Sequence, residues 1–176
     1  MNILVIGAGG MLGDKLVKQL ARAGQLGGQR ITKLTRHDVI LPPAPPSSNF
    51  QIDTLMGDVS SADEAASVIA EKPDVIFHLA AIVSGEAEAD FDKGYRINLD
   101  GTRNLLEAIR VIGGGYCPKF IFTSSIAVFG APFPDSISDE YFTTPLTSYS
   151  TQKAICELLI SDYSRRVTLP PDLNPY

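Results

Sequence analysis

The sequence has few of the features that by themselves indicate a class of protein. The 176 residues contain two cysteines, Cys117 and Cys156, which lie far apart and form no C-x-x-C pair. Neither a disulfide framework nor a zinc site is expected, and no metal site is predicted. Both thiols are expected to be plain and partly buried. No internal repeat is visible, and the compositional bias is confined to a proline cluster at residues 42–46.

Basic residues are few and do not gather in one stretch. The chain holds 15 lysines and arginines against 20 aspartates and glutamates, which gives a net charge of −5. An acidic protein without a basic run is poorly suited to bind nucleic acid or an anionic membrane surface. We therefore expect no nucleic-acid partner and no membrane partner, and a small molecule as the ligand.

Long apolar runs are absent as well. The apolar stretch near the N-terminus is too short for a membrane span or a signal peptide, and no basic segment precedes it. A cytoplasmic protein is the expectation. With 44% hydrophobic residues, the chain is long enough for one buried core and short for two, so residues 1–176 are interpreted as one domain.

The chain does contain a glycine-rich turn close to its beginning. Ile3–Ile6 is predicted to be a buried strand, and Gly7, Gly10 and Gly13 follow at a spacing of three before a helical pattern starts. In that context Gly7 allows a tight turn, Gly10 lets the backbone approach a pyrophosphate, and Gly13 lets the helix pack against the sheet. Glycines can fall into this register by chance, but their position directly after the first strand predicts a dinucleotide site.

Strand and helix patterns alternate along the rest of the chain. Further strands are predicted at residues 31–39, 51–56, 74–79 and 119–124, and helices at residues 14–23, 61–70, 91–112 and 148–166. Either Ser60 or Ser61 is expected to cap the second helix, and a loop is expected around Ser84. With right-handed crossovers, the alternation predicts an α/β fold, a Rossmann-type doubly wound parallel sheet with its ligand crevice at the carboxyl ends of the strands.

The end of the chain does not fit this pattern well. Residues 167–176 begin like a sixth strand and then break into prolines, which a strand inside a sheet should not do. The expectation is that a C-terminal, substrate-binding part is missing, and that a chain ending at Tyr176 is incomplete as an enzyme.

Two acidic residues follow predicted strands at the crevice edge. Asp38 ends the second strand 25 residues beyond Gly13, close to the separation at which a carboxylate binds an adenosine ribose. Asp38 favours NAD over NADP, because a carboxylate repels a 2′-phosphate, whereas Arg36 could instead attract that phosphate. Asp58, followed by Val59, is placed near the adenine or else caps the next helix.

Tyr149 and Lys153 form a pair on the last predicted helix. Four residues apart, they project from the same face, so the ammonium can lie beneath the phenol. A free tyrosine has a pKa of roughly 10, and a nearby cation favours its phenolate, which brings the group into range as a general base. Ser125, at the end of the preceding strand, can hold the same substrate hydroxyl. The Tyr-x-x-x-Lys spacing is common on solvated helices, so its weight comes from following a dinucleotide loop.

Six segments in order resemble an extended short-chain dehydrogenase/reductase of the NAD-dependent epimerase/dehydratase type. They are GAGGMLG, GDV, HLAA, NLDGT, TSSIAVFG and YSTQK, which begin at residues 7, 57, 78, 98, 123 and 149. The resemblance covers essentially the whole chain. Within that superfamily, the segments AAIVSGEAEADFD and FGAPFPDSISDEYFTTPLTSYSTQKAICELL look like the D-erythronate dehydrogenases, which are NAD-dependent enzymes that oxidise a four-carbon sugar acid.

The resemblance implies a role for each residue that it covers. Tyr149 would accept the proton, Lys153 would lower its pKa and hold the nicotinamide ribose, and Ser125 would bind substrate together with Ser84. Asn98 would shape the site and its proton relay, unless it is a buried residue bonded to backbone. The remaining cofactor contacts would come from Gly10, Met11 and Leu12 at the pyrophosphate, and from Leu79, Ala80 and Ala81 at the adenosine. NAD is the implied cofactor, and a homodimer is the expected assembly.

Two other functions are compatible with these residues. A nucleotide-sugar epimerase shares the fold and the Tyr/Lys pair, whereas a dehydratase would need acidic residues where Ile126 and Ala127 follow Ser125. A non-catalytic dinucleotide sensor is also possible, but a sensor would not need Ser125, Tyr149 and Lys153 together. The prediction is therefore oxidation of a secondary hydroxyl of a small sugar acid, most simply D-erythronate to 2-oxo-erythronate.

Overall fold

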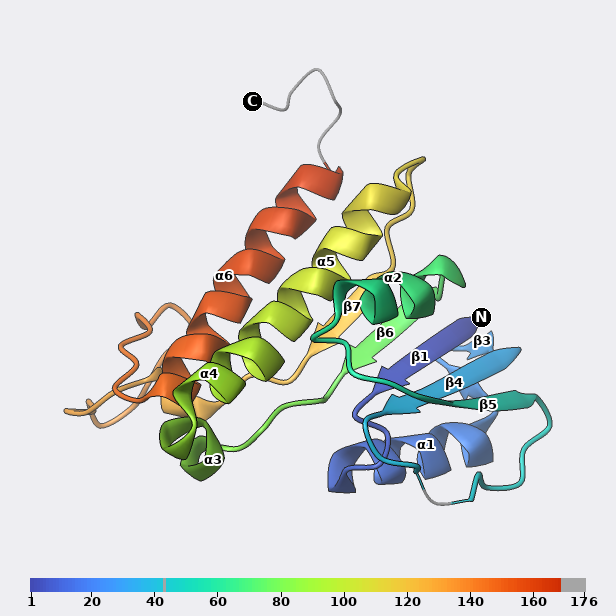
Figure 1. Ribbon diagram of the computed structural model, residues 1–176, viewed down its shortest axis with the longest axis horizontal. Helices are drawn as coiled ribbons and strands as arrows, with labels where there is room; N and C mark the ends of the chain where they lie inside the picture. Colours follow the sequence, from blue (N-terminus) through green and yellow to red (C-terminus); the bar gives the residue numbers. More distant parts are fainter. Residues whose placement is uncertain (43, 169–176) are drawn as a thin grey trace.

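The computed structural model describes residues 1–42 and 44–168, which form a parallel sheet covered by helices on both faces. Within this part of the chain the sheet has five strands in the order β5-β4-β1-β6-β7 (Figure 1). The strands are β1 Asn2–Ile6, β4 Lys33–Asp38, β5 Gln51–Met56, β6 Val75–His78 and β7 Lys119–Phe122. The strand order reverses on either side of β1, so the predicted doubly wound sheet is confirmed.

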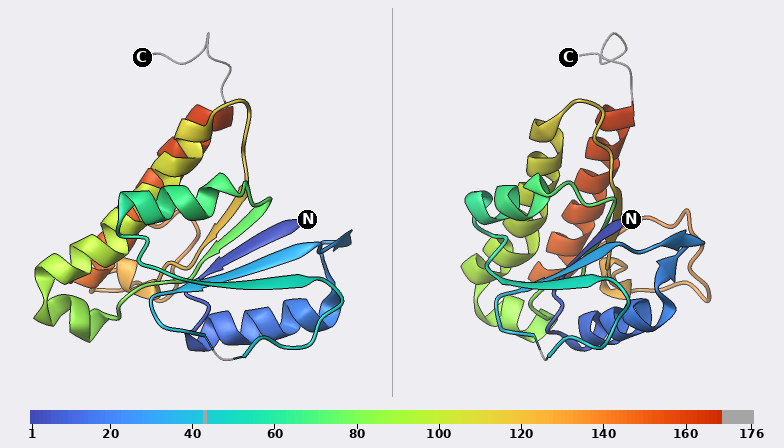
Figure 2. Two further views of the ribbon diagram at one scale, coloured as in Figure 1. Left: turned by 45° about the vertical axis from the view of Figure 1, so that its right-hand side comes forward. Right: turned by 90° about the vertical axis from the view of Figure 1, so that its right-hand side faces the viewer.

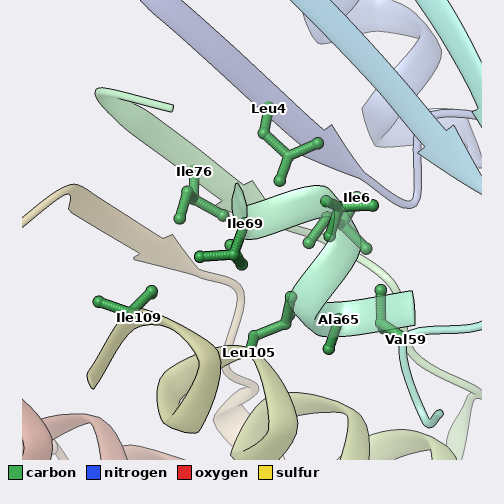
Figure 3. Packing of buried hydrophobic residues seen from close by; sticks show 9 residues of the cluster. Leu4, Ile6, Val59, Ala65, Ile69, Ile76, Leu105 and Ile109 are labelled. Atoms are coloured by element: carbon green, nitrogen blue, oxygen red, sulfur yellow. The ribbon is translucent and has the colours of Figure 1, made fainter. Parts of the chain in front are cut away.

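The helices divide unequally between the two faces of the sheet. Figure 2 shows α1 (Met11–Ala23) on one face, and α2 (Ala62–Ala70), α5 (Gly101–Ile112) and α6 (Ser148–Thr168) on the other. Successive side chains of β1 point to opposite faces of the sheet, so each face offers apolar side chains for helices to cover. Leu4 and Ile6 pack with residues of α2 and α5 (Figure 3), whereas Ile3 and Val5 pack with residues of α1.

The crossover into α5 is a helix with a change of winding in its middle. It begins as α4 (Phe91–Gly94), continues as a π-helical segment from Tyr95 to Asp100, and ends as α5. The predicted helix over residues 91–112 is therefore confirmed in extent. The π-helical segment carries Asn98, whose side chain is buried, and short π-helical stretches are frequent at functional sites.

Several local details differ from the predictions or add to them. The segment around Ser84 is a helix, α3 (Ser84–Ala89), rather than a loop. Ser61 occupies the N-cap position of α2, but its side chain makes no capping hydrogen bond to a described residue. Residues 25–30 form a small hairpin of β2 (Gln25–Leu26) and β3 (Gln29–Arg30) that the sequence did not suggest.

The expected sixth strand and the burial of the thiols also need correction. Val167 and Thr168 are the last residues of α6, so the first two residues of the expected strand are helical, and residues 169–176 lie outside the described part of the chain. Of the two cysteines, Cys117 is exposed and Cys156 is fully buried, so neither is partly buried as expected.

Candidate functional site

A pocket of about 260 Å³ lies at the carboxyl edge of the sheet. The segments after β1, β4, β5 and β6 all contribute to it, which is the position where doubly wound sheets bind ligands. The predicted cofactor residues among its lining are Gly7, Gly10, Asp38, Asp58, Val59, Leu79, Ala80 and Ala81. Among the described residues the lining does not include Met11, Leu12 or Gly13, which begin α1 beside the pocket.

The glycine turn has the geometry that its sequence predicts. Gly7 has a φ of +87°, and a Cβ added to it would lie 2.6 Å from the backbone nitrogen of Ala80. A Cβ on Gly13 would collide with the carbonyl oxygen of Gly7, so α1 could not pack this closely with any other residue there. Gly10 has looser surroundings, with the carbonyl oxygen of Gly7 3.4 Å from an added Cβ, and it lines the pocket.

Asp38 and Arg36 occupy different environments although both lie on β4. The Oδ2 atom of Asp38 accepts a hydrogen bond of 2.8 Å from the Gly9 backbone nitrogen, and Asp38 lines the pocket. Arg36 is 4% exposed and donates to the hydroxyl of Thr54 on the neighbouring strand. Burial lowers the pKa of the Arg36 guanidinium. The charged side chain of β4 at the pocket is therefore the carboxylate of Asp38.

Asp58 lies both at the pocket and at the turn that leads into α2, although the N-cap residue of α2 is Ser61. It lines the pocket, and its Oδ1 atom accepts a hydrogen bond of 2.9 Å from the Ser60 backbone nitrogen, where the chain turns toward α2. Its Oδ2 atom accepts from Arg96 Nη1, also at 2.9 Å. Burial alone would raise the pKa of Asp58, but the hydrogen bonds from Ser60 and Arg96 outweigh it, and the pKa lies below its usual value.

The pocket also has contributors that the sequence did not reveal. His37 lines it, is 1% exposed, and places Nε2 2.8 Å from Oε1 of Glu64 on α2. A Cβ on Gly57 would collide with that same carboxylate, so Gly57 leaves room for the pair. The sequence signal for this arrangement is Gly57, which belongs to the GDV segment.

Tyr149 and Lys153 meet on α6 as their spacing predicts. Lys153 is 2% exposed, its Nζ atom donates to the Thr123 carbonyl oxygen at 2.9 Å, and it lies 4.5 Å from the centre of the Phe122 ring. The same ammonium is 5.8 Å from the centre of the half-buried Tyr149 ring. Burial lowers the pKa of Lys153 to about 8, and this value keeps the group mostly cationic at neutral pH.

Ser125 follows the last residue of β7 by three positions and directly precedes a short 3₁₀ turn, Ile126–Val128, that packs against α6. Its Oγ atom accepts a hydrogen bond of 3.1 Å from the Ala127 backbone nitrogen, so its O–H proton is available to a ligand. Ser84, by contrast, is exposed at the first turn of α3. The same short helix contributes Glu88, whose Oε1 atom accepts from the Ser148 backbone nitrogen at 3.0 Å and so caps α6.

Asn98 is 2% exposed, and its side chain is bonded to backbone and to one other side chain. Its Oδ1 atom accepts from the Ile82 nitrogen at 2.9 Å, and its Nδ2 atom donates to the Ile82 oxygen and to Gln152 Oε1. His78, the last residue of β6, is buried nearby, with Nε2 3.0 Å from the Thr102 hydroxyl. Burial, together with the nearby Lys153 cation, lowers the pKa of His78 to about 3, which keeps the ring neutral.

No group of three histidine, cysteine, aspartate or glutamate side chains within residues 1–42 and 44–168 could hold a metal ion. No helix in that part of the chain is long and apolar enough to cross a membrane.

Comparison with protein families gives a match over nearly the whole chain. The model of the NAD dependent epimerase/dehydratase family matches residues 3–171. The D-erythronate dehydrogenase of Cupriavidus necator is 44% identical over 170 residues, which is 94% of this chain and 51% of that protein. The D-erythronate dehydrogenase of Haemophilus influenzae is 41% identical over 168 residues, with the same coverage of 94% and 51%. The chain thus spans about half the length of these relatives.

Solved structures agree with the fold. A nucleoside-diphosphate-sugar epimerase from Agrobacterium tumefaciens superposes with a TM-score of 0.91 at 61% identity, covering 94% of this chain and 49% of that one. A UDP-glucose 4-epimerase from Brucella ovis, solved in complex with NAD, superposes with a TM-score of 0.78 at 27% identity. That match covers 96% of this chain and 49% of the epimerase.

Proposed function

The chain belongs to the NAD dependent epimerase/dehydratase family, and from this premise we propose that it supplies the cofactor site and the base of an NAD-dependent dehydrogenase. The proposed reaction is oxidation of a secondary hydroxyl of a small sugar acid, D-erythronate to 2-oxo-erythronate. The observation that carries the proposal is the placement of Tyr149 beside the buried ammonium of Lys153, on the helix that packs beside the 3₁₀ turn after Ser125.

The residues of the pocket fit a dinucleotide. Gly7 and Gly13 occupy places where a Cβ would collide with backbone, and together they bring the start of α1 close to the sheet, where its N–H groups can face a pyrophosphate. Asp38 offers the free lone pairs of its carboxylate to the adenosine ribose, and Asp58 and Val59 line the region proposed for the adenine. Because Arg36 is buried and bonded to Thr54, the carboxylate decides the preference, and we propose NAD rather than NADP.

The chemistry of the chain's own residues follows from their positions. Bound NAD supplies the acceptor for the hydride that leaves the substrate carbon. Tyr149 accepts the proton of the substrate hydroxyl, and the Lys153 ammonium lies 5.8 Å from the centre of its ring. Ser125 donates its O–H to the same substrate oxygen and fixes its position. The proton leaves the hydroxyl oxygen and the hydride leaves the carbon that bears it, so this C–OH group becomes a carbonyl.

Two observations bear on the substrate, and they point to different candidates. The relatives at 44% and 41% identity carry the name D-erythronate dehydrogenase, which supports a sugar acid. The structure at 61% identity is titled a nucleoside-diphosphate-sugar epimerase, and this supports the second candidate, an epimerase that acts on a nucleotide-sugar. Both functions use the Tyr149/Lys153 pair, so the substrate separates them.

The test is a substrate screen with the full-length protein and NAD. Reduction of NAD, followed at 340 nm, is expected with D-erythronate and not with UDP-sugars. Epimerisation gives no net reduction of NAD, so product analysis of the UDP-sugar reactions by chromatography completes the comparison. Turnover of a UDP-sugar without turnover of D-erythronate would replace the first candidate by the second.

For the assembly, we propose a homodimer formed through α5 and α6, which lie side by side (Figure 1). Val111 of α5 is 68% exposed and Leu158 of α6 is 69% exposed, and burying such side chains would stabilise a contact between two copies. Sedimentation of the native chain and of Leu158→Glu tests this proposal, since the variant is expected to sediment as a monomer. A monomeric native chain would contradict the proposal.

A further inference from the structure

Two buried amide side chains face each other between the π-helical segment and α6. Asn98 is 2% exposed and Gln152 is fully buried. The Nδ2 atom of Asn98 donates to Oε1 of Gln152 at 2.8 Å. Burying a polar side chain costs free energy unless its hydrogen bonds are made, so this contact stabilises the place of both residues. Gln152 directly precedes Lys153 on α6, and its position there is fixed relative to the Tyr149/Lys153 pair.

On its other side Asn98 holds the wall of the dinucleotide pocket. Its Oδ1 atom accepts from the Ile82 nitrogen at 2.9 Å, and its Nδ2 atom also donates to the Ile82 oxygen at 3.2 Å. Ile82 lines the pocket. Both protons of the Asn98 amide are therefore in use, one toward Ile82 and one toward Gln152. A continuous chain of hydrogen bonds thus joins the pocket wall to the helix of Tyr149 and Lys153.

The oxygen and the nitrogen of the Gln152 side-chain amide differ in their hydrogen bonding. Oε1 accepts the bond from Asn98, whereas Nε2 has no hydrogen-bond partner within residues 1–42 and 44–168. A Cβ on Gly94 of α4 would lie 2.7 Å from that nitrogen, so the amide is enclosed on this side. Gln152 is the hydrogen-bond acceptor in its contact with Asn98. Substitutions that keep an acceptor at this position should therefore differ in effect from substitutions that remove it.

We infer that Gln152 is a positioning residue, which holds Asn98 and, through Asn98, the Ile82 wall of the dinucleotide pocket in register with Tyr149 and Lys153. This inference rests on the proposed function in one respect, that the pocket binds NAD. It assigns to the residue before the helix lysine a part in cofactor binding, although Gln152 itself is not part of the pocket lining among the described residues.

The test compares two substitutions of similar size in the full-length protein. Gln152→Glu keeps an acceptor for Asn98, and Gln152→Met removes it. The dissociation constant for NAD is measured by calorimetry without any substrate. Loss of one bond in a buried amide pair predicts an NAD affinity at least about fivefold lower in Gln152→Met, and within about twofold of the native value in Gln152→Glu. Cys156→Ala is the matched control, since its thiol contacts the backbone oxygen of Asn98 at 3.3 Å rather than the side-chain amide, and it is expected to bind NAD like the native chain.

A double substitution shows whether Gln152 affects NAD binding through Asn98. If Gln152 acts through Asn98, the effect of Gln152→Met on the NAD dissociation constant should be nearly absent in the Asn98→Ala background. Additive effects would overturn the inference. So would a Gln152→Met variant that melts at a lower temperature but binds NAD within twofold of native, or a Gln152→Glu variant as impaired as Gln152→Met. Gln152→Ala removes the same acceptor and replaces Gln152→Met if that variant does not fold, with the same twofold limit.

The failures of the two proposals can be told apart. A native protein that binds NAD but oxidises no sugar acid contradicts the proposed substrate and leaves the role of Gln152 in place. A native protein that binds NAD equally well with and without the Gln152 acceptor contradicts the inference and leaves the proposed function in place.

Discussion

Lys153→Met should change how the stability of the chain depends on pH. The ammonium of Lys153 is buried, with Nζ 2.9 Å from the Thr123 carbonyl oxygen and 4.5 Å from the centre of the Phe122 ring. One carbonyl oxygen and two aromatic faces replace only part of the hydration that the group has in the unfolded chain. For this reason burial lowers its pKa from the ordinary value of 10.5 to about 8.

The direction and size of the effect follow from this shift. Below pH 8 both the folded and the unfolded chain carry the proton, and the full cost of burying the cation is present. Between pH 8 and 10.5 the folded chain releases the proton and the unfolded chain keeps it, so the free energy of unfolding rises with pH. At about 1.4 kcal/mol per pKa unit, the whole shift corresponds to about 3 kcal/mol.

The measurement is urea denaturation of the native chain and of Lys153→Met from pH 7.5 to 10.5. Other groups titrate in the same range, so the informative quantity is the difference in unfolding free energy between the two proteins. This difference should change by about 3 kcal/mol in favour of the native chain as the pH rises. Lys15→Met, at an exposed position of α1, controls for the loss of one lysine. A difference that stays constant with pH would mean that the ammonium is well hydrated, and the account of Lys153 as a poorly solvated cation beside Tyr149 would be wrong.

Three further outcomes are expected. NAD should bind at least about tenfold tighter than NADP, equivalent to about 1.4 kcal/mol, and Asp38→Asn should reduce this ratio in paired titrations. Equal affinities in the native chain would mean that Asp38 does not bind the ribose. Tyr149→Phe should abolish turnover in the full-length protein while the NAD affinity stays within a few-fold, and substantial activity would require another base. Gly13→Ala should lower the unfolding free energy by about 2 kcal/mol or more, because the added Cβ would meet the Gly7 carbonyl oxygen. Gly85→Ala, with open space around it, should not have this effect. Similar melting temperatures of the two variants would contradict the packing argument.

The parallel sheet and the glycine turn beside the pocket could be predicted from the sequence because the residue patterns that indicate them are local. The run Ile3–Ile6 and the three glycines after it lie within twelve consecutive residues, and the alternation of strands and helices then left few topologies. The family resemblance is confirmed by the match over residues 3–171. The meeting of Lys153 with Tyr149 was predictable for the same reason, since the spacing of four fixes it within one helix.

What could not be predicted depends on contacts between distant parts of the chain. Asn98 and Gln152 are 54 residues apart in sequence, and no pattern connects them. The pairing of His37 with Glu64 across two elements is of the same kind. The segment of α3 has no apolar period, and Ala87 is its one buried residue among the six, so the periodicity gave no signal for this helix, which packs against α4 and α6. The roles assigned to all the site residues, among them Ser84, Met11 and Leu12, stay predictions.

The π-helical segment from Tyr95 to Asp100 has a consequence for the rotational phase of the helix that contains it. A π-helical turn holds one residue more than an α-helical turn, so every residue after it is rotated about the axis by about 100° relative to an uninterrupted α-helix. The residues before and after the segment can therefore present faces that a regular helix would not align. With the present phase, Leu105 and Ile109 point into the core (Figure 3) while Asn98 faces Ile82 and Gln152. Deleting a single residue from the segment would therefore turn one set or the other away from its neighbours.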